Sequence, residues 1–211
     1  DIKSRWNDDD PTGWEWLNNG KDFLWVSEKD GWRHIFLVSR DGKKETLITK
    51  GDYDIDNIKC IDDKNNYVYF MASPNNATQL YLYRTKLNGK GKLEPLSPPN
   101  LVGTNNYNIS PFGKYAFHSF SNYKTFPVSE WITLPNGKPL DEAKSIAMNM
   151  KVNENSNIHY FKVTTEDNIT LDGWIVYPDN FEATKKYPVV FYVYGEPAAE
   201  TVGDRFGAQY D

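Results

Sequence analysis

Short aromatic and β-branched runs recur along the first 139 residues at a spacing in the forties. The copies begin at Phe23, Tyr67 and Tyr115, which are 44 and then 48 residues apart. Turns with glycine, as at Gly31 and Gly42, separate the runs within a copy. A repeat of this length with several short strands per copy is typical of propeller blades, whereas a β-sandwich gives no reason for copies in matching order. The pattern therefore predicts a mostly β chain whose residues 1–139 form about three four-stranded blades of a partial β-propeller.

The composition supports β structure and excludes several classes of function. Phe, Trp and Tyr make up 15% of the 211 residues, and aromatic residues favour strands. The formal net charge is −5 and no stripe of Lys and Arg is visible, so nucleic acid is not expected as a partner. No apolar run has the length of a membrane-spanning helix. The single cysteine, Cys60, rules out an internal disulfide and is expected to be inert and half-buried. No metal-ligand spacing or phosphate-binding loop predicts a metal or a cofactor.

The pattern changes near residue 140. Leu140, Ala143, Ala147 and Met148 have helical spacing and follow Pro139, so they predict one short helix. We expect residues 140–156 to form a helical hinge after the last blade.

Strands return after this hinge. Two strand-like runs, 158–164 and 170–177, flank the turn 165–168 and predict a β-hairpin. An antiparallel hairpin followed by a buried strand is one way in which an α/β sheet with an antiparallel edge begins.

A continuous apolar and aromatic run, 189–194, follows the hairpin. Pro188 and Gly195 bound this run, which predicts a strand buried on both faces. The strand ends at Tyr194 just before a glycine turn, so its phenol is placed to face a cleft. The alternative is that Tyr194 only caps a core strand.

The chain resembles the dipeptidyl peptidase IV branch of the prolyl oligopeptidase family of serine peptidases, and bacterial members in particular. The resemblance is carried by residues 23–34 (FLWVSEKDGWRH), 47–53 and 185–197, and it extends over almost the whole chain in order. It implies an eight-bladed propeller over an α/β-hydrolase domain, and release of X-Pro or X-Ala dipeptides from peptide N-termini. It also implies that this chain is a fragment with the last blades (1–139), the hinge (140–156) and the first hydrolase strands (157–211).

The resemblance assigns one catalytic residue to this chain. Tyr194 matches the family tyrosine whose phenol donates to the oxyanion of the tetrahedral intermediate, a role that contributes on the order of 3 kcal/mol. Glu196 departs from the glycine or alanine often found there and receives no role. No serine lies in a Gly-x-Ser-x-Gly elbow, so the catalytic Ser, Asp and His are expected outside this chain and the fragment alone is expected to be inactive. His34, His118 and His159 are expected to be structural.

Two other functions fit the same sequence. One is a non-catalytic β-propeller binding module, and the other is an acylaminoacyl peptidase or oligopeptidase of the same fold. For the peptidase, the resemblance implies a peptide substrate, a secreted or periplasmic location and a possible homodimer. Three glycosylation sequons, at Asn76, Asn108 and Asn168, are interpreted as ordinary turn residues.

Overall fold

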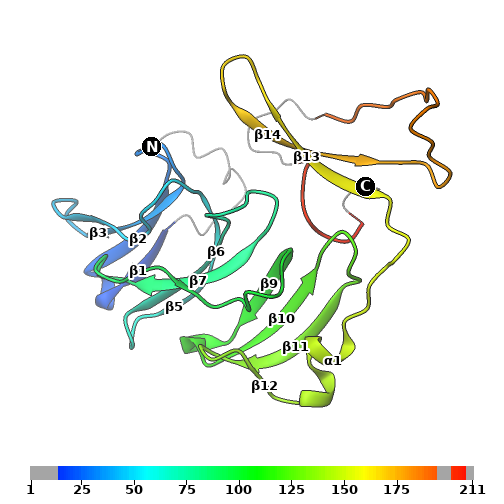
Figure 1. The fold of residues 1–211 in the computed structure, drawn as a ribbon. Coiled ribbons are helices and arrows are strands. Elements are labelled where there is room, and N and C mark those ends of the chain that lie inside the picture. Colours follow the sequence, from blue (N-terminus) through cyan, green and yellow to red (C-terminus); the bar gives the residue numbers. More distant parts are fainter. Residues whose placement is uncertain (1–13, 194–200, 208–211) are drawn as a thin grey trace.

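The structure is a computed structural model that describes residues 14–193 and 201–207. Three four-stranded antiparallel sheets follow one another along the chain, and a two-stranded sheet comes after them (Figure 1). In each four-stranded sheet the strands pair in chain order. This meander confirms the prediction of a mostly β chain with about three blades.

The blades have the following strands. The first contains β1 (Trp14–Leu17), β2 (Asp22–Ser27), β3 (His34–Ser39) and β4 (Glu45–Leu47), with η1 (Asn18–Gly20) after β1. The second contains β5 (Ile55–Asp62), β6 (Tyr67–Ala72), β7 (Tyr81–Lys86) and β8 (Glu94–Pro95). The third contains β9 (Thr104–Ile109), β10 (Tyr115–Ser121), β11 (Val128–Thr133) and β12 (Lys138–Pro139), with η2 (Pro111–Gly113) between β9 and β10.

The hydrophobic core lies between neighbouring blades. Leu24 and Ile35 of the first blade pack with Phe70 of the second, while Met71 of the second blade packs with Ile132 of the third. Because side chains alternate across each strand, a middle blade presents one apolar face to each neighbour. This packing is the one expected of propeller blades.

The hinge differs from its prediction. It consists of η3 (Glu142–Lys144) and α1 (Ile146–Asn149), separated by Ser145 in an extended conformation that caps α1. The four residues that predicted one apolar face, Leu140, Ala143, Ala147 and Met148, are all exposed. Ile146 is buried instead and packs with Phe120 of the third blade. The predicted helical face was wrong because the caps restart the helix at residue 146.

The hairpin prediction is confirmed. β13 (Ile158–Thr164) and β14 (Thr170–Val176) pair from Ile158 opposite Val176 to Thr164 opposite Thr170. The turn contains Asn168 at φ 63°, a left-handed conformation that asparagine tolerates.

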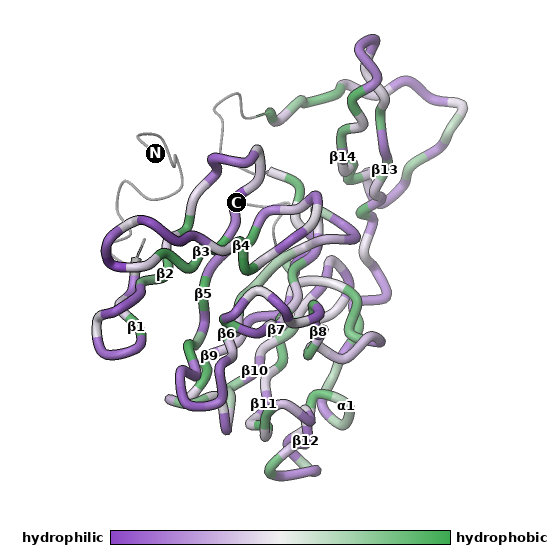
Figure 2. Tube along the Cα trace, turned by 90° about the vertical axis from the view of Figure 1, so that its left-hand side faces the viewer, coloured by the Kyte–Doolittle hydropathy of each residue, from purple (hydrophilic) through white to green (hydrophobic). Residues whose placement is uncertain are grey.

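The predicted buried strand is not formed in the described part of the run, residues 189–193. These residues have no strand conformation, and Val190 and Phe191 are 94% and 85% exposed. Figure 2 shows the run as a green stretch outside the sheets. A buried strand needs neighbours that pair with its N–H and C=O groups, and no described strand pairs with these residues. Burial on both faces was therefore a wrong prediction.

Candidate functional site

One end of the blades carries a cavity. This end, which we call the upper face, holds the connections 28–33, 48–54, 73–80 and 122–127, and the hairpin β13–β14 lies above it (Figure 1). The cavity has a volume of about 710 Å³ and is lined by loops of the first two blades, by Thr104 of the third blade, and by Tyr192, Thr201, Gly203 and Arg205. Segments more than a hundred residues apart in sequence therefore share this cavity.

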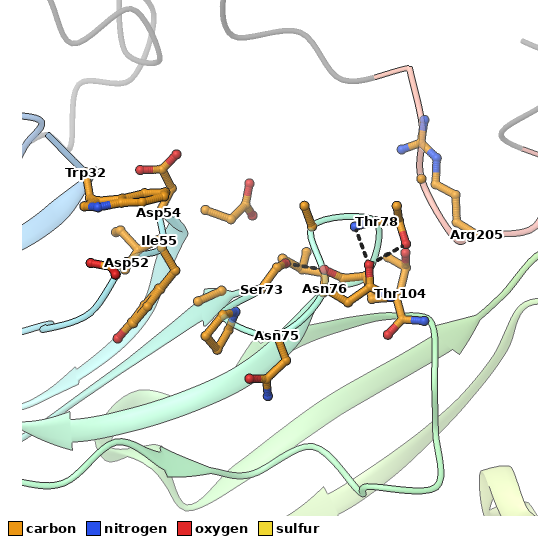
Figure 3. Close-up of a pocket in the computed structure, with 18 of the residues that line it drawn as sticks. Trp32, Asp52, Asp54, Ile55, Ser73, Asn75, Asn76, Thr78, Thr104 and Arg205 are labelled. Atoms are coloured by element: carbon orange, nitrogen blue, oxygen red, sulfur yellow. Dashed lines mark hydrogen bonds between the residues drawn. The ribbon is translucent and has the colours of Figure 1, made fainter. Parts of the chain in front are cut away.

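The first wall of the cavity is acidic. Figure 3 shows Trp32, Asp52 and Asp54 on one side of the cavity and Arg205 on the opposite side. Asp52, Asp54 and Asp56 are all exposed, so they place negative charge beside the opening. Such a wall favours a positively charged group, for example the free amine of a peptide.

A buried arginine holds the acidic wall in place. The backbone N–H of Arg33 donates to Asp54 Oδ1, and its guanidinium donates to the carbonyls of Ile55 and Asp56. Arg33 is itself buried and precedes β3 of the first blade. The start of β5 is therefore tied to the neighbouring blade, which fixes the position of the aspartates.

The connection between β6 and β7 forms the floor of the cavity. Asn76 Oδ1 accepts hydrogen bonds from the N–H of Thr78 at 3.1 Å and from its hydroxyl at 2.9 Å, as the dashed lines in Figure 3 show. The Ser73 hydroxyl donates to the carbonyl of Gln79. These bonds order the loop and leave Asn75 exposed beside the cavity. Asn76 thus lies in a turn, as was expected of it.

Tyr194, the residue assigned to the oxyanion, lies outside the described residues. The described phenol closest to it in sequence, Tyr192, lines the cavity and is 61% exposed. The run that leads to Tyr194 therefore reaches the cavity.

The three histidines lie in structural positions, and none of them lines the cavity. His34 Nδ1 is 2.9 Å from Asp30 Oδ2. His118 is fully buried and lies between Glu130 and Asn105. His159 is exposed on the hairpin and packs edge-on against the ring of Tyr177. Nothing brings these imidazoles together.

Cys60 is half-buried, as expected. Burial raises the pKa of its thiol, so the thiol stays protonated and is a weaker nucleophile. This agrees with an inert cysteine.

Neither the acidic wall nor the segment 201–205 was predicted from the sequence. The signal for the wall was available, since Asp52, Asp54 and Asp56 alternate with the buried Tyr53 and Ile55. Such alternation indicates an extended segment with one buried apolar face and one exposed acidic face. The segment 201–205 carries no comparable local signal.

Neither a metal cluster nor a membrane-spanning helix occurs within residues 14–193 and 201–207. In these ranges no three His, Cys, Asp or Glu side chains are grouped closely enough to hold a metal ion. None of the helices in the same ranges has the length and hydrophobicity that crossing a membrane requires.

Known proteins are similar to this chain in sequence. Residues 4–127 match the family model of the dipeptidyl peptidase IV (DPP IV) N-terminal region. The chain belongs to this family. Dipeptidyl peptidase 4 of Trichophyton rubrum is 28% identical over 195 residues, which cover 90% of this chain and 25% of that protein.

Two solved structures of bacterial proteins have a similar fold. The crystal structure of Porphyromonas gingivalis dipeptidyl peptidase 4 has a TM-score of 0.73 at 23% identity, covering 92% of this chain and 27% of that one. A Bacteroides ovatus protein has a TM-score of 0.74 at 20% identity, with 92% and 30% covered. These similarities support the arrangement of the sheets. The chain spans about a quarter of the length of the curated relatives it matches.

Proposed function

We propose that this chain is part of a serine exopeptidase that releases X-Pro or X-Ala dipeptides from the N-termini of peptides. The observation that supports this most is the family match over residues 4–127, because these residues include the blade loops that line the cavity. The nucleophile, its histidine and its aspartate belong to other parts of the longer enzyme, so the 211-residue chain alone has no activity. The blades end at residue 139, the hinge covers 140–156 and the hydrolase domain begins at 157.

In this proposal Tyr194 is the oxyanion donor. A fixed phenol near the developing negative charge stabilises the transition state more than the bound substrate. The acidic wall with Asp52 and Asp54 faces the same cavity and favours peptides with a free, positively charged amine. An enzyme that releases a dipeptide from an N-terminus must recognise that amine, whereas an enzyme that cleaves at internal positions need not.

The resemblance adds a secreted or periplasmic location and a homodimer to the proposal. Fractionation of the source cells tests the location, and sedimentation of the longer enzyme tests the dimer.

Replacing Tyr194 tests the catalytic assignment. In the longer enzyme, Tyr194→Phe removes one hydrogen-bond donor and is expected to lower kcat about 100- to 1000-fold with little change in KM, because the bond forms in the transition state. Tyr115→Phe is the control, since it removes an exposed phenol that does not line the cavity, and we expect kcat to stay within about twofold. A chromogenic Gly-Pro substrate measures both constants. An unchanged kcat for Tyr194→Phe would remove this residue from the mechanism.

A further inference from the structure

Residues 201–207, which we call the docking segment, connect the hairpin to the blades. On the hairpin side, Trp174 Nε1 donates to the carbonyl of Thr201 at 2.9 Å and the Tyr160 hydroxyl donates to the carbonyl of Gly203 at 2.8 Å. On the blade side, the Phe206 ring lies 4.5 Å from that of Phe126 between centroids. The segment therefore bridges two parts of the molecule.

The main contact of the docking segment is Asp204, which is only 6% exposed. Its Oδ1 accepts from the backbone N–H of Tyr123 at 3.0 Å, and its Oδ2 accepts from Gln79 Nε2 at 3.0 Å. Its backbone N–H donates to the carbonyl of Thr78, and its carbonyl accepts from the Thr104 hydroxyl. All four polar groups of this residue are thus satisfied by the blades.

These four partners, which we call the Asp204 socket, come from two adjacent blades. Thr78 and Gln79 belong to the β6–β7 connection of the second blade, whereas Thr104 begins β9 and Tyr123 follows β10 of the third. Gln79 is held in turn, because its Oε1 accepts from the Tyr81 hydroxyl at 2.6 Å. A buried carboxyl is costly unless its oxygens are hydrogen-bonded, and the socket provides a donor to each oxygen.

We propose that Asp204 is a positioning residue that anchors the docking segment to the second and third blades and so fixes the far wall of the cavity. Thr201, Gly203 and Arg205 line this wall, and Asp204 lies between them with its side chain in the socket. That the wall faces a peptide rests on the proposed function, but the anchoring itself does not.

Hydrogen exchange of the 211-residue chain tests the anchor directly. Asp204→Ala removes the acceptor of the Tyr123 N–H and is expected to raise exchange of the residue 123 and residue 204 amides about tenfold or more. Amides within β6 and β7 are expected to exchange as before. Asp179→Ala is a control on an exposed aspartate whose bond to Asn157 lies outside the socket, and it should leave both amides unchanged.

Asp204→Asn separates the socket from a general loss of stability. Its side-chain oxygen can accept from the Tyr123 N–H. Its amide can donate to Gln79 Oε1 once the Gln79 amide has rotated, and the Tyr81 hydroxyl then accepts from Gln79 Nε2. We therefore expect this variant to keep both amides within about threefold of the natural chain.

Three results would overturn the proposal. These are unchanged exchange in Asp204→Ala, an equal rise across the blade strands, and an Asp204→Asn variant as fast as Asp204→Ala. The measurement needs no substrate, so a failure of the proposed peptidase function leaves its outcome unaffected.

Discussion

At the scale of single residues, the buried carboxyl of Asp204 is subject to two opposing effects on its pKa. Burial raises the pKa of this carboxyl, while the hydrogen bonds from the Tyr123 N–H and from Gln79 lower it to a smaller extent. The other ionisable groups nearby are Arg205, next in the chain, and the Tyr81 phenol, whose pKa is itself raised by burial. The net effect is that the docked segment favours the protonated carboxyl.

This balance predicts how docking depends on pH. A carboxyl whose pKa is higher when docked than when free favours docking below its free pKa, and this contribution is lost as the pH rises through the docked pKa. After correction for the intrinsic rate, we expect exchange of the Tyr123 amide to increase from about pH 4 to about pH 7. Asp204→Asn does not titrate and should show no such increase. A decrease over this range in the natural chain would mean that docking favours the ionised carboxyl instead.

Gly103 illustrates a backbone position that only glycine fits. Its φ is +147°, and a Cβ there would lie 2.6 Å from the carbonyl oxygen of Ser121. Gly103→Ala should therefore destabilise the chain by roughly 3 kcal/mol, from strain and from the clash with backbone. Gly137→Ala is the matched control, because that glycine also has a positive φ but has no atom within 4 Å, and its cost should be only about 1 kcal/mol. Urea unfolding measures both, and equal losses would contradict the role of the clash.

At the scale of elements, a buried polar network joins the third blade to the hinge. Oε1 of Glu130, a residue of β11, lies 3.1 Å from His118 Nδ1. Oε2 of the same carboxylate accepts from the N–H of Ile146 at 3.0 Å. His118 Nε2 donates to Asn105 Oδ1, because the Asn105 amide group already donates to two carbonyls. The network thus holds α1 against β10 and β11.

Removing the carboxyl of this network should be costly. Glu130→Ala leaves His118 and the Ile146 N–H buried without this partner, which is expected to lower the free energy of unfolding by roughly 3 kcal/mol. Glu130→Gln should cost at most about 1 kcal/mol, since its amide can donate to His118 Nδ1 and its oxygen can accept from Ile146. Urea titration followed by tryptophan fluorescence gives both values. Similar losses in the two variants would argue against hydrogen bonding as the cause.

Elements with a local sequence pattern could be predicted, whereas elements whose burial depends on other parts of the chain could not. The hairpin β13–β14 was predicted to within a residue, because alternation and turn chemistry are local. The first strands β5 and β9 were missed, since β9 reads Thr-Asn-Asn-Tyr-Asn-Ile and buries Asn105 completely. A buried asparagine is acceptable here because the carbonyls of Leu80 and Leu101 accept from its amide. The apolar run 189–193 was predicted to be a buried strand but is exposed, because burial of a strand depends on neighbouring strands that its own sequence does not specify.

At the scale of the whole molecule, the blades were predictable from their repeat, but the cavity was not. Its walls come from loops that contacts such as the hydrogen bond between Gln79 and Asp204 bring together. These two residues are 125 positions apart, so no local sequence pattern predicts that they pair. The blades provide the acidic wall and the floor, and the docking segment provides the far wall. In the proposed peptidase, the propeller forms one side of the substrate site.

Product analysis of the longer enzyme tests this account most directly. A peptide that begins with Gly-Pro is incubated with the enzyme, either with a free N-terminus or N-acetylated, and the products are identified by mass spectrometry. We expect loss of one dipeptide from the free peptide and none from the acetylated one, because acetylation removes the positive charge that the acidic wall favours. Release of an acetylated residue, cleavage at internal positions only, or no cleavage of either peptide would contradict it.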